Sequence, residues 1–275
     1  MSTTKILVCC HKLDVFKNDE LYIPIHVGKA LSKCDLGIQG DDTGDNISKE
    51  NPHFCELTGL YWAWKNMTPV DYIGLCHYRR YFNFHNKGTL FSDYTIIKSK
   101  DLDALDLSLP DIDNLFKRYD IIMSKPRCYP YSLAIDYSVC QVSEDLRSLF
   151  AIVEKLYPEY MSDMNDVFNK SNKLSHYNMM IMRWHDFDKY CKWLFNILFE
   201  AKKEINIEHY NAVQGRIWGY MSERLLSVYV RHERMNVKHF SIYWINDDVI
   251  QKSFINRMTV YYRYMLSFAL NRPYK

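Results

Sequence analysis

The chain has 275 residues, of which 48% are hydrophobic and 25% are charged. A chain of this length and composition can bury a sizeable core, which excludes global disorder. Its formal net charge of +2 lacks the basic excess of a general nucleic-acid binder. Tyrosine is frequent, with 22 residues, and its apolar ring with a polar tip suits sugar stacking as well as an ordinary core.

The predicted elements alternate between strands and helices in the first half of the chain, and helices dominate later. In chain order they are a buried strand at 5–11, an extended or turn segment at 21–28, a polar loop at 40–52, a helix at 53–67, a strand at 71–78, an edge segment at "YTIIKS", a helix at 110–120, a strand at 120–127, a helix at 143–157 capped by Ser143, a strand in "HYNMMIMRWHDF", and helices at 187–205 and 212–233. This order favours an α/β fold with a mixed, mostly parallel sheet flanked by helices and a helix-rich C-terminal half.

The eight cysteines form no C-x-x-C pair, so their spacing gives no sign of a zinc ribbon or a thioredoxin-like site. Most lie in apolar runs such as "ILVCC", which favours buried, reduced thiols and a cytoplasmic protein. "MSTTKILVCCHK" lacks the pattern of a signal peptide, and no run of about 18 apolar residues predicts a membrane-spanning helix.

Arginines stand at the end of the predicted strand "YIGLCHYRRYF". Ligands of open α/β sheets bind at the carboxyl ends of strands, and an arginine fork matches phosphate oxygens. We therefore expect Arg79 and Arg80, with His77, to hold a diphosphate, against the alternative that they pair with surface acids.

Acidic pairs offer a different way to bind a diphosphate, in which a D-x-D motif chelates a divalent ion. The chain has "DLD" at 101–103, "DID" at 111–113 and "NDD" at 246–248, and none clearly follows a buried strand. Phosphate-binding glycine loops are absent. We therefore expect no metal site, with a metal-dependent site at Asp101 and Asp103 as the alternative.

Two further polar stretches are candidates for binding or chemistry. Asn46 and Asn51 offer amide groups suited to sugar hydroxyls or to the edge of a base, and Glu56 lies among apolar residues, where a carboxylate needs a partner. We expect that partner to be Arg79 or Arg80. The alternative is a capped helix start with a structural ion pair.

His176 and Asn178 precede an apolar strand, where polar residues often line an acceptor site, and Glu223 lies on a helix. A helix carboxylate facing a cleft can act as a general base toward a sugar hydroxyl. The alternatives are turn capping for the first two residues and a solvated or salt-bridged Glu223–Arg224 pair.

These stretches together resemble a bacterial family from capsule, exopolysaccharide and O-antigen loci, long catalogued as a domain of unknown function and regarded as glycosyltransferases of GT-A-like fold. The matching segments include "GDNISKENPHFCELTGLYWAWKN", "YIGLCHYRRYF", "IIMSKPR", "YNMMIMRWHDFDKYCKWLFNILFE" and "QGRIWGYMSERLL", and they span about residues 5–245. One departure is Gln141, which stands where the family pattern has a histidine, so the choice of donor or acceptor can differ.

The resemblance implies one GT-A-like domain at 1–245 that transfers a hexose, galactose or galactofuranose, from a UDP-sugar to a lipid-linked glycan without a metal. It places Lys125 of "IIMSKPR" with the donor-binding residues. The aromatic and basic segment 246–275 is predicted to be a helical tail, which either contacts an anionic membrane or packs on the domain or a sister subunit. A non-catalytic carbohydrate-binding subunit is the remaining alternative.

Overall fold

The computed structural model describes residues 2–85, 92–248 and 258. The strands are β1 (Thr4–Cys10), β2 (Tyr22–His26), β3 (Gln39–Gly40), β4 (Tyr72–His77), β5 (Arg80–Phe82), β6 (Tyr94–Ile97), β7 (Ile121–Ser124), β8 (Arg127–Cys128), β9 (Lys173–Leu174), β10 (Met180–Arg183), β11 (Val237–Phe240) and β12 (Ile242–Ile245). The α-helices are α1 (Asn51–Phe54), α2 (Leu57–Asn66), α3 (Ile112–Leu115), α4 (Leu133–Cys140), α5 (Ser143–Leu156), α6 (Met161–Asn165), α7 (Trp184–Glu204) and α8 (Ile217–His232).

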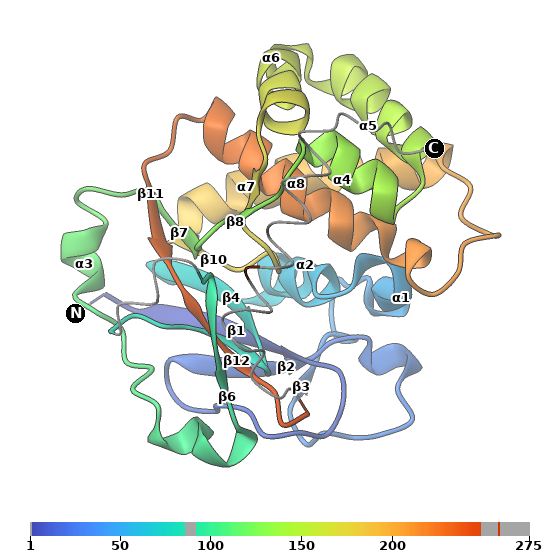
Figure 1. Cartoon of the computed structure of the whole chain (residues 1–275). Helices are drawn as coiled ribbons and strands as arrows, with labels where there is room; N and C mark the ends of the chain where they lie inside the picture. The colour runs from blue at the N-terminus through green and yellow to red at the C-terminus, as the bar shows by residue number, and fades with distance from the viewer. Residues whose placement is uncertain (1, 86–91, 249–257, 259–275) are drawn as a thin grey trace.

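The strands of the main sheet lie in the order β11-β7-β10-β4-β1-β2-β3. Most neighbours are parallel, but β10 runs antiparallel to both β4 and β7. A branch leaves β4 through β5, which pairs with β12, and β12 in turn pairs with β6. The prediction of a mixed, mostly parallel α/β sheet with a helix-rich C-terminal half is therefore confirmed (Figure 1).

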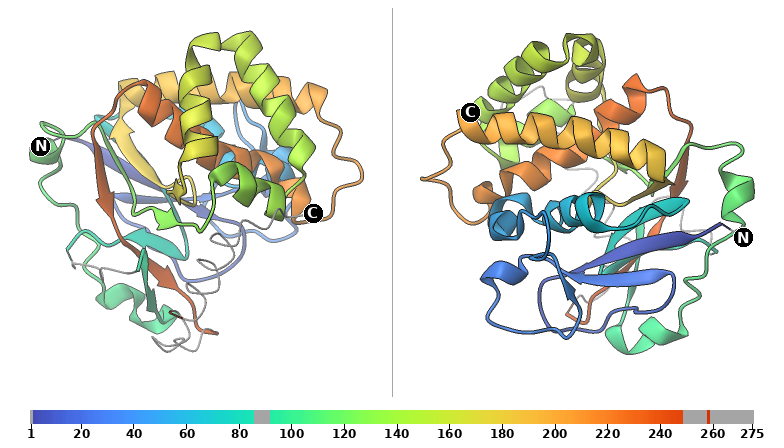
Figure 2. Two further views of the ribbon diagram at one scale, coloured as in Figure 1. Left: turned by 45° about the horizontal axis from the view of Figure 1, so that its top comes forward. Right: turned by 180° about the vertical axis from the view of Figure 1, so that it is seen from behind.

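The sheet buries both of its faces, as the continuous apolar strands require. Along β1, Leu7 and Cys9 belong to one core cluster, whereas Ile6, Val8 and Cys10 belong to the other. The first cluster contains residues of α2, α5, α7 and α8, and the second contains residues of β5 and β12. Figures 1 and 2 show the helices α4 to α8 gathered on one side of the sheet, with β6 and β12 on the other.

The predicted helix at 53–67 is broken in two by Cys55, which has a left-handed φ of 54° and separates α1 from α2. Gly59 allows α2 to pack closely on the sheet, because a Cβ at this position would lie 2.8 Å from Val27 Cγ1. The break is local, but it decides where the side chain of Glu56 points.

Two other helix predictions need correction. The helix expected at 110–120 is the single turn α3, since the chain must straighten to enter β7. The Ser143 side chain does not cap α5; it donates to Glu144 Oε2, and Val142 stands at the cap position.

In the described part of the chain, no helix has the length and apolar character needed to cross a membrane. Most of the predicted tail at 246–275 lies outside the described residues.

Candidate functional site

The carboxyl ends of β1, β4 and β7 meet at one edge of the sheet, where β10 begins. Because β10 is antiparallel, the residues just before it lie beside the last residues of its neighbours: Met180 pairs with Leu75 of β4 and with Met123 of β7. The predicted site residues His77, His176 and Asn178 are brought together here, although about 100 residues of sequence separate the first from the others.

Residues 176–178 form a turn in which two successive side-chain-bearing residues are left-handed, with φ of 74° at Tyr177 and 52° at Asn178. Each such conformation costs about 1 kcal/mol or more in a residue other than glycine. A turn of this kind persists only where the surrounding structure holds it.

The backbone of this turn is held from three elements. Ser124 Oγ of β7 donates to the carbonyl of His176 over 3.1 Å. His77 Nε2 of β4 lies 2.8 Å from the carbonyl of Tyr177, and Glu223 Oε1 of α8 accepts the Tyr177 amide at 2.6 Å. Burial and the Arg80 charge lower the pKa of His77 to about 3, so its imidazole is neutral when it donates to the carbonyl.

The side chains of His176 and Glu223 face one another. His176 Nδ1 lies 3.4 Å from Glu223 Oε2, and its Nε2 lies 2.6 Å from the Tyr129 hydroxyl. Burial disfavours the Glu223 carboxylate, but the contact with His176, the Arg224 charge and the Tyr177 amide together outweigh it and lower the pKa of Glu223. A carboxylate in contact with an imidazole can accept a proton from a bound hydroxyl, which is the chemistry of a general base.

Glu56 reaches the same turn from the break between α1 and α2. Its Oε1 accepts from Asn178 Nδ2 at 2.7 Å, and Asn178 Oδ1 accepts from Ser222 Oγ at 3.0 Å. The prediction that Arg79 or Arg80 is the partner of Glu56 is therefore wrong. Burial, and to a lesser degree the Glu223 charge, raise the pKa of Glu56 to about 7.

The two adjacent arginines differ in their surroundings. β4 and β5 form a tight hairpin in which Arg80 pairs with His77, which leaves Arg79 in the connecting turn. Arg79 donates twice to Asp14 Oδ2, at 2.9 and 2.7 Å, as the ion-pair alternative expects. The guanidinium of Arg80 instead lies 4.2 Å from the centre of the Tyr177 ring, and within the described residues its buried Nε has no hydrogen-bond partner.

Arg127, a residue that the sequence did not single out, lies on the other side of Tyr177. It donates to Asp93 Oδ2 at 3.0 Å and to the Tyr177 hydroxyl at 3.4 Å. The predicted donor residue Lys125 donates to the carbonyl of Ser92. The Tyr177 ring thus bridges two cations, Arg80 and Arg127, at the edge of the sheet.

Asn46 and Asn51 hydrogen-bond within their own segment. Asn46 donates to Gly44 and accepts the Ser48 amide. Asn51 Nδ2 donates to the Cys55 carbonyl at 2.8 Å and to Thr58 Oγ1 at 3.2 Å. No side-chain hydrogen bond caps the start of α1 or α2, so the alternative of a capped helix start is not met. A direct contact of Asn46 or Asn51 with a donor stays a prediction.

The alternative metal residues Asp101 and Asp103 lie on an exposed 3₁₀ helix, Ser99–Ala104, after the edge strand β6. The Asp103 side chain is 96% exposed and pairs with Lys17. Across residues 2–85, 92–248 and 258, no group of three or more His, Cys, Asp or Glu side chains is arranged to hold a metal ion.

The neighbours Glu223 and Arg224 on α8 are both buried, so the solvated alternative for this pair does not hold. Arg224 Nη2 bonds Asp136 Oδ2 of α4 at 2.5 Å, with side-chain exposures of 5% and 7%. This ion pair ties α4 to α8 behind the His176–Glu223 contact.

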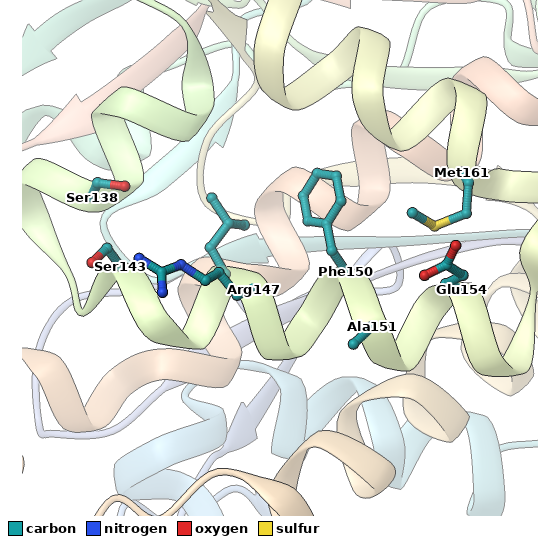
Figure 3. Close-up of a pocket in the computed structure, with 8 residues that line it drawn as sticks. Ser138, Ser143, Arg147, Phe150, Ala151, Glu154 and Met161 are labelled. Atoms are coloured by element: carbon teal, nitrogen blue, oxygen red, sulfur yellow. The ribbon is translucent and has the colours of Figure 1, made fainter.

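A surface hollow along α5 is a separate feature (Figure 3). It is lined by Ser138, Ser143, Leu146, Arg147, Phe150, Ala151, Glu154 and Met161. None of the predicted site residues lines it.

Sequence reasoning missed Tyr129, Arg127, Tyr177 and Ser222. Tyr177 stands between His176 and Asn178, so proximity in sequence was a usable signal. For Tyr129, Arg127 and Ser222, by contrast, only the folded chain shows that they meet the turn.

Comparison with known proteins agrees with this architecture. A solved structure of WbbM, a bifunctional glycosyltransferase in its apo form, matches with a TM-score of 0.80 and 33% sequence identity over 92% of this chain. The present chain spans about half of that protein, 48% of its length. This likeness confirms the predicted GT-A-like fold class.

Residues 5–234 match the family described as "Domain of unknown function (DUF4422)", and the chain belongs to that family. No curated protein matches the chain.

Proposed function

We propose that the protein is a glycosyltransferase that moves a hexose, galactose or galactofuranose, from a UDP-sugar to a hydroxyl of a growing, lipid-linked surface polysaccharide. The likeness to a bifunctional glycosyltransferase supports the reaction class. The observation that carries the proposal is the arrangement around Tyr177: the Arg80 guanidinium lies against its ring, and Glu223 accepts its amide. Among the described residues no carboxylate pairs with Arg80, so an unpaired cation and a general-base pair both contact Tyr177.

In this reaction the bond between the anomeric carbon and the diphosphate breaks, and a bond from that carbon to the acceptor oxygen forms. The acceptor hydroxyl loses its proton to the His176–Glu223 pair. The diphosphate leaves with the bonding electrons, and Arg80 stabilises the charge that develops on it. Asn178 orients the turn that carries His176, through its bonds to Glu56 and Ser222.

Arg80 is better suited to a phosphate than Arg79, because Asp14 already neutralises Arg79. Asp93 pairs with Arg127 in the same way, through Nε and Nη2, and Nη2 also lies 3.4 Å from the Tyr177 hydroxyl. We place His77 and Lys125 beside the donor and leave Arg79 to brace the loop that follows β1. The cation at the diphosphate is the reason for proposing a reaction that needs no metal.

A donor screen tests the proposal. Purified protein is incubated with UDP-, GDP- and dTDP-sugars, and nucleotide release is measured in EDTA and with added Mn²⁺. We expect release from a UDP-hexose in EDTA. Release that requires Mn²⁺ would remove the metal-independent part, and the absence of release from every donor, with no thermal shift by UDP, would remove the transferase.

A further inference from the structure

The strained turn at residues 176–178 is anchored by two carboxyl groups rather than one. Glu223 accepts the backbone amide of Tyr177, and Glu56 accepts the side-chain amide of Asn178. Glu223 also contacts His176, so its part in proton transfer is direct. Glu56 contacts the turn only through Asn178, and the function proposed above gives it no chemical step.

The geometry of Asn178 makes this contact directional. Its Nδ2 donates to Glu56 Oε1, and its Oδ1 lies 3.0 Å from Ser222 Oγ on the other side. The same Nδ2 lies 3.4 Å from the Gly219 carbonyl of α8. The Asn178 amide therefore connects the residue before α2 to α8 at the start of β10, and these bonds hold its left-handed backbone in place.

The backbone at Glu56 is constrained by its neighbours. It follows Cys55, whose φ of 54° ends α1, and the Asn51 side chain donates to the Cys55 carbonyl. The Glu56 carbonyl accepts from Cys9 Sγ of β1 at 3.8 Å. The carboxyl group has little room to follow the turn if the turn relaxes.

We propose that Glu56 is a positioning residue: through Asn178 it holds the turn 176–178 in the strained conformation that presents His176 and Glu223 to the acceptor. The proposal rests on the transferase function above. It assigns Glu56 to the catalytic turn and not to the donor pocket.

A carboxyl oxygen can accept the Asn178 bond in either protonation state, and so can the amide oxygen of glutamine. Burial raises the pKa of Glu56 to about 7, whereas its hydrogen bond with Asn178 acts in the opposite direction and favours the ionised form. The carboxylate accepts the Asn178 bond more strongly than the protonated group does, so the contact with the turn strengthens as pH rises through about 7.

Five charged or titratable groups lie around Glu56, each at a different place in the fold. They are Cys9 of β1, Cys55 at the helix break, Tyr190 of α7, Arg216 before α8 and Glu223 of α8. Burial raises the pKa of Cys9, Cys55 and Tyr190, so these three stay neutral near pH 7, and Arg216 stays charged.

Turnover of the UDP-hexose that the wild-type chain accepts best tests the proposal in Glu56→Ala and Glu56→Gln. We expect the Ala variant to lose about 10- to 100-fold in kcat with a smaller change in KM for the donor, since a misplaced catalytic group costs rate more than binding. The Gln variant should recover most of that loss. It should also lack the rise in turnover that ionisation of Glu56 produces in the wild type as pH rises through about 7.

The matched control is Asp145→Asn. Asp145 is also buried, at 3% exposure, and burial raises its pKa. It accepts from the Tyr210 hydroxyl and not from the turn, so its replacement should leave both kcat and the pH profile unchanged. If Glu56→Gln is as slow as Glu56→Ala, the carboxyl itself is needed and the positioning role is overturned. It is overturned equally if Glu56→Ala is as fast as the wild type.

A second measurement needs no substrate and separates this inference from the proposed function. Hydrogen–deuterium exchange of the peptide covering residues 175–182 should be faster in Glu56→Ala, should return toward wild type in Glu56→Gln, and should rise less in Ser222→Ala, which loosens Asn178 from its other side. Equal exchange in all variants would overturn the inference. If the exchange rates change as expected but the chain turns over no donor, only the proposed transferase function is overturned. If Glu56→Ala does not fold, the exchange rate of the same peptide is compared between Ser222→Ala and Glu56→Gln instead.

Discussion

The polar loop before α1 and the turn before β10 both contain the residue types of a sugar-binding site, but the two regions make different contacts. In the loop, Asn46 and Asn51 bond to groups within seven residues. In the turn, Tyr177 and Asn178 bond to Glu223 and Glu56, which lie 46 and 122 residues away in sequence.

Local contacts of this kind stabilise a loop and leave few donors for a ligand. Long-range contacts that also impose strain cost folding energy, and strained positions cluster at functional sites. The two regions therefore cannot be told apart by their residue types. They differ in how far away in sequence the hydrogen-bond partners of their side chains and amides lie.

The largest expected effect comes from removing the charge at the turn. Glu223→Gln keeps an acceptor for the Tyr177 amide but removes the carboxylate that faces His176, so turnover should fall on the order of 100-fold or more. The matched change in the loop is Asp45→Asn, where Asp45 accepts from the Tyr61 hydroxyl, and it should change turnover less than about twofold. Equal losses in steady-state assays would erase the distinction between the two regions.

The next effect separates the two arginines. Arg80→Ala should weaken UDP binding by about tenfold or more, because a hydrogen bond to a charged group contributes about 1.5–3 kcal/mol. Arg79→Ala frees Asp14 and should affect UDP affinity much less. Titration calorimetry with UDP measures both, and a larger loss in Arg79→Ala would reverse the assignment.

A third effect concerns stability and its dependence on pH. Burial raises the pKa of Glu56 from its ordinary value of 4.5 to about 7, which corresponds to about 3 kcal/mol. The folded chain holds this proton more tightly than the unfolded chain, so the contribution is fully present below about pH 4.5 and is lost as pH rises through about 7.

Urea unfolding of the wild type and Glu56→Gln, measured from pH 5 to pH 8, checks this. The free energy of unfolding of the wild type should decline relative to that of the variant over this range. Parallel curves would mean that Glu56 ionises as it does in the unfolded chain.

The smallest effect lies in the loop. Asn46→Ala removes two hydrogen bonds of the loop and should lower the free energy of unfolding by about 1 kcal/mol, with UDP affinity changed less than about twofold. A tenfold loss of affinity without loss of stability would instead place Asn46 against the donor, as the sequence prediction has it.

Much of the fold was predictable because strand and helix periodicity are local properties. The strands at 5–11 and 71–78 and the helix at 187–205 match β1, β4 and α7 closely. The break at Cys55 was not predictable, because the apolar spacing continues through it and only the contacts of Asn51 reveal the left-handed residue. α4, β11 and β12 were missed for a related reason, since short segments of this kind are settled by their packing partners.

For the site, the sequence by itself placed His77 and Arg80 at a strand end and His176 and Asn178 before a strand, because polar residues that interrupt apolar runs are visible in any linear reading. It also named Glu56 as a buried carboxyl group that needs a partner. Only the tertiary structure decided that this partner is Asn178, that Asp14 takes Arg79, and that Tyr177 stands between Arg80 and Glu223. The physical reason is that the antiparallel insertion of β10 between β4 and β7 brings distant residues to one edge, and no local pattern encodes that pairing.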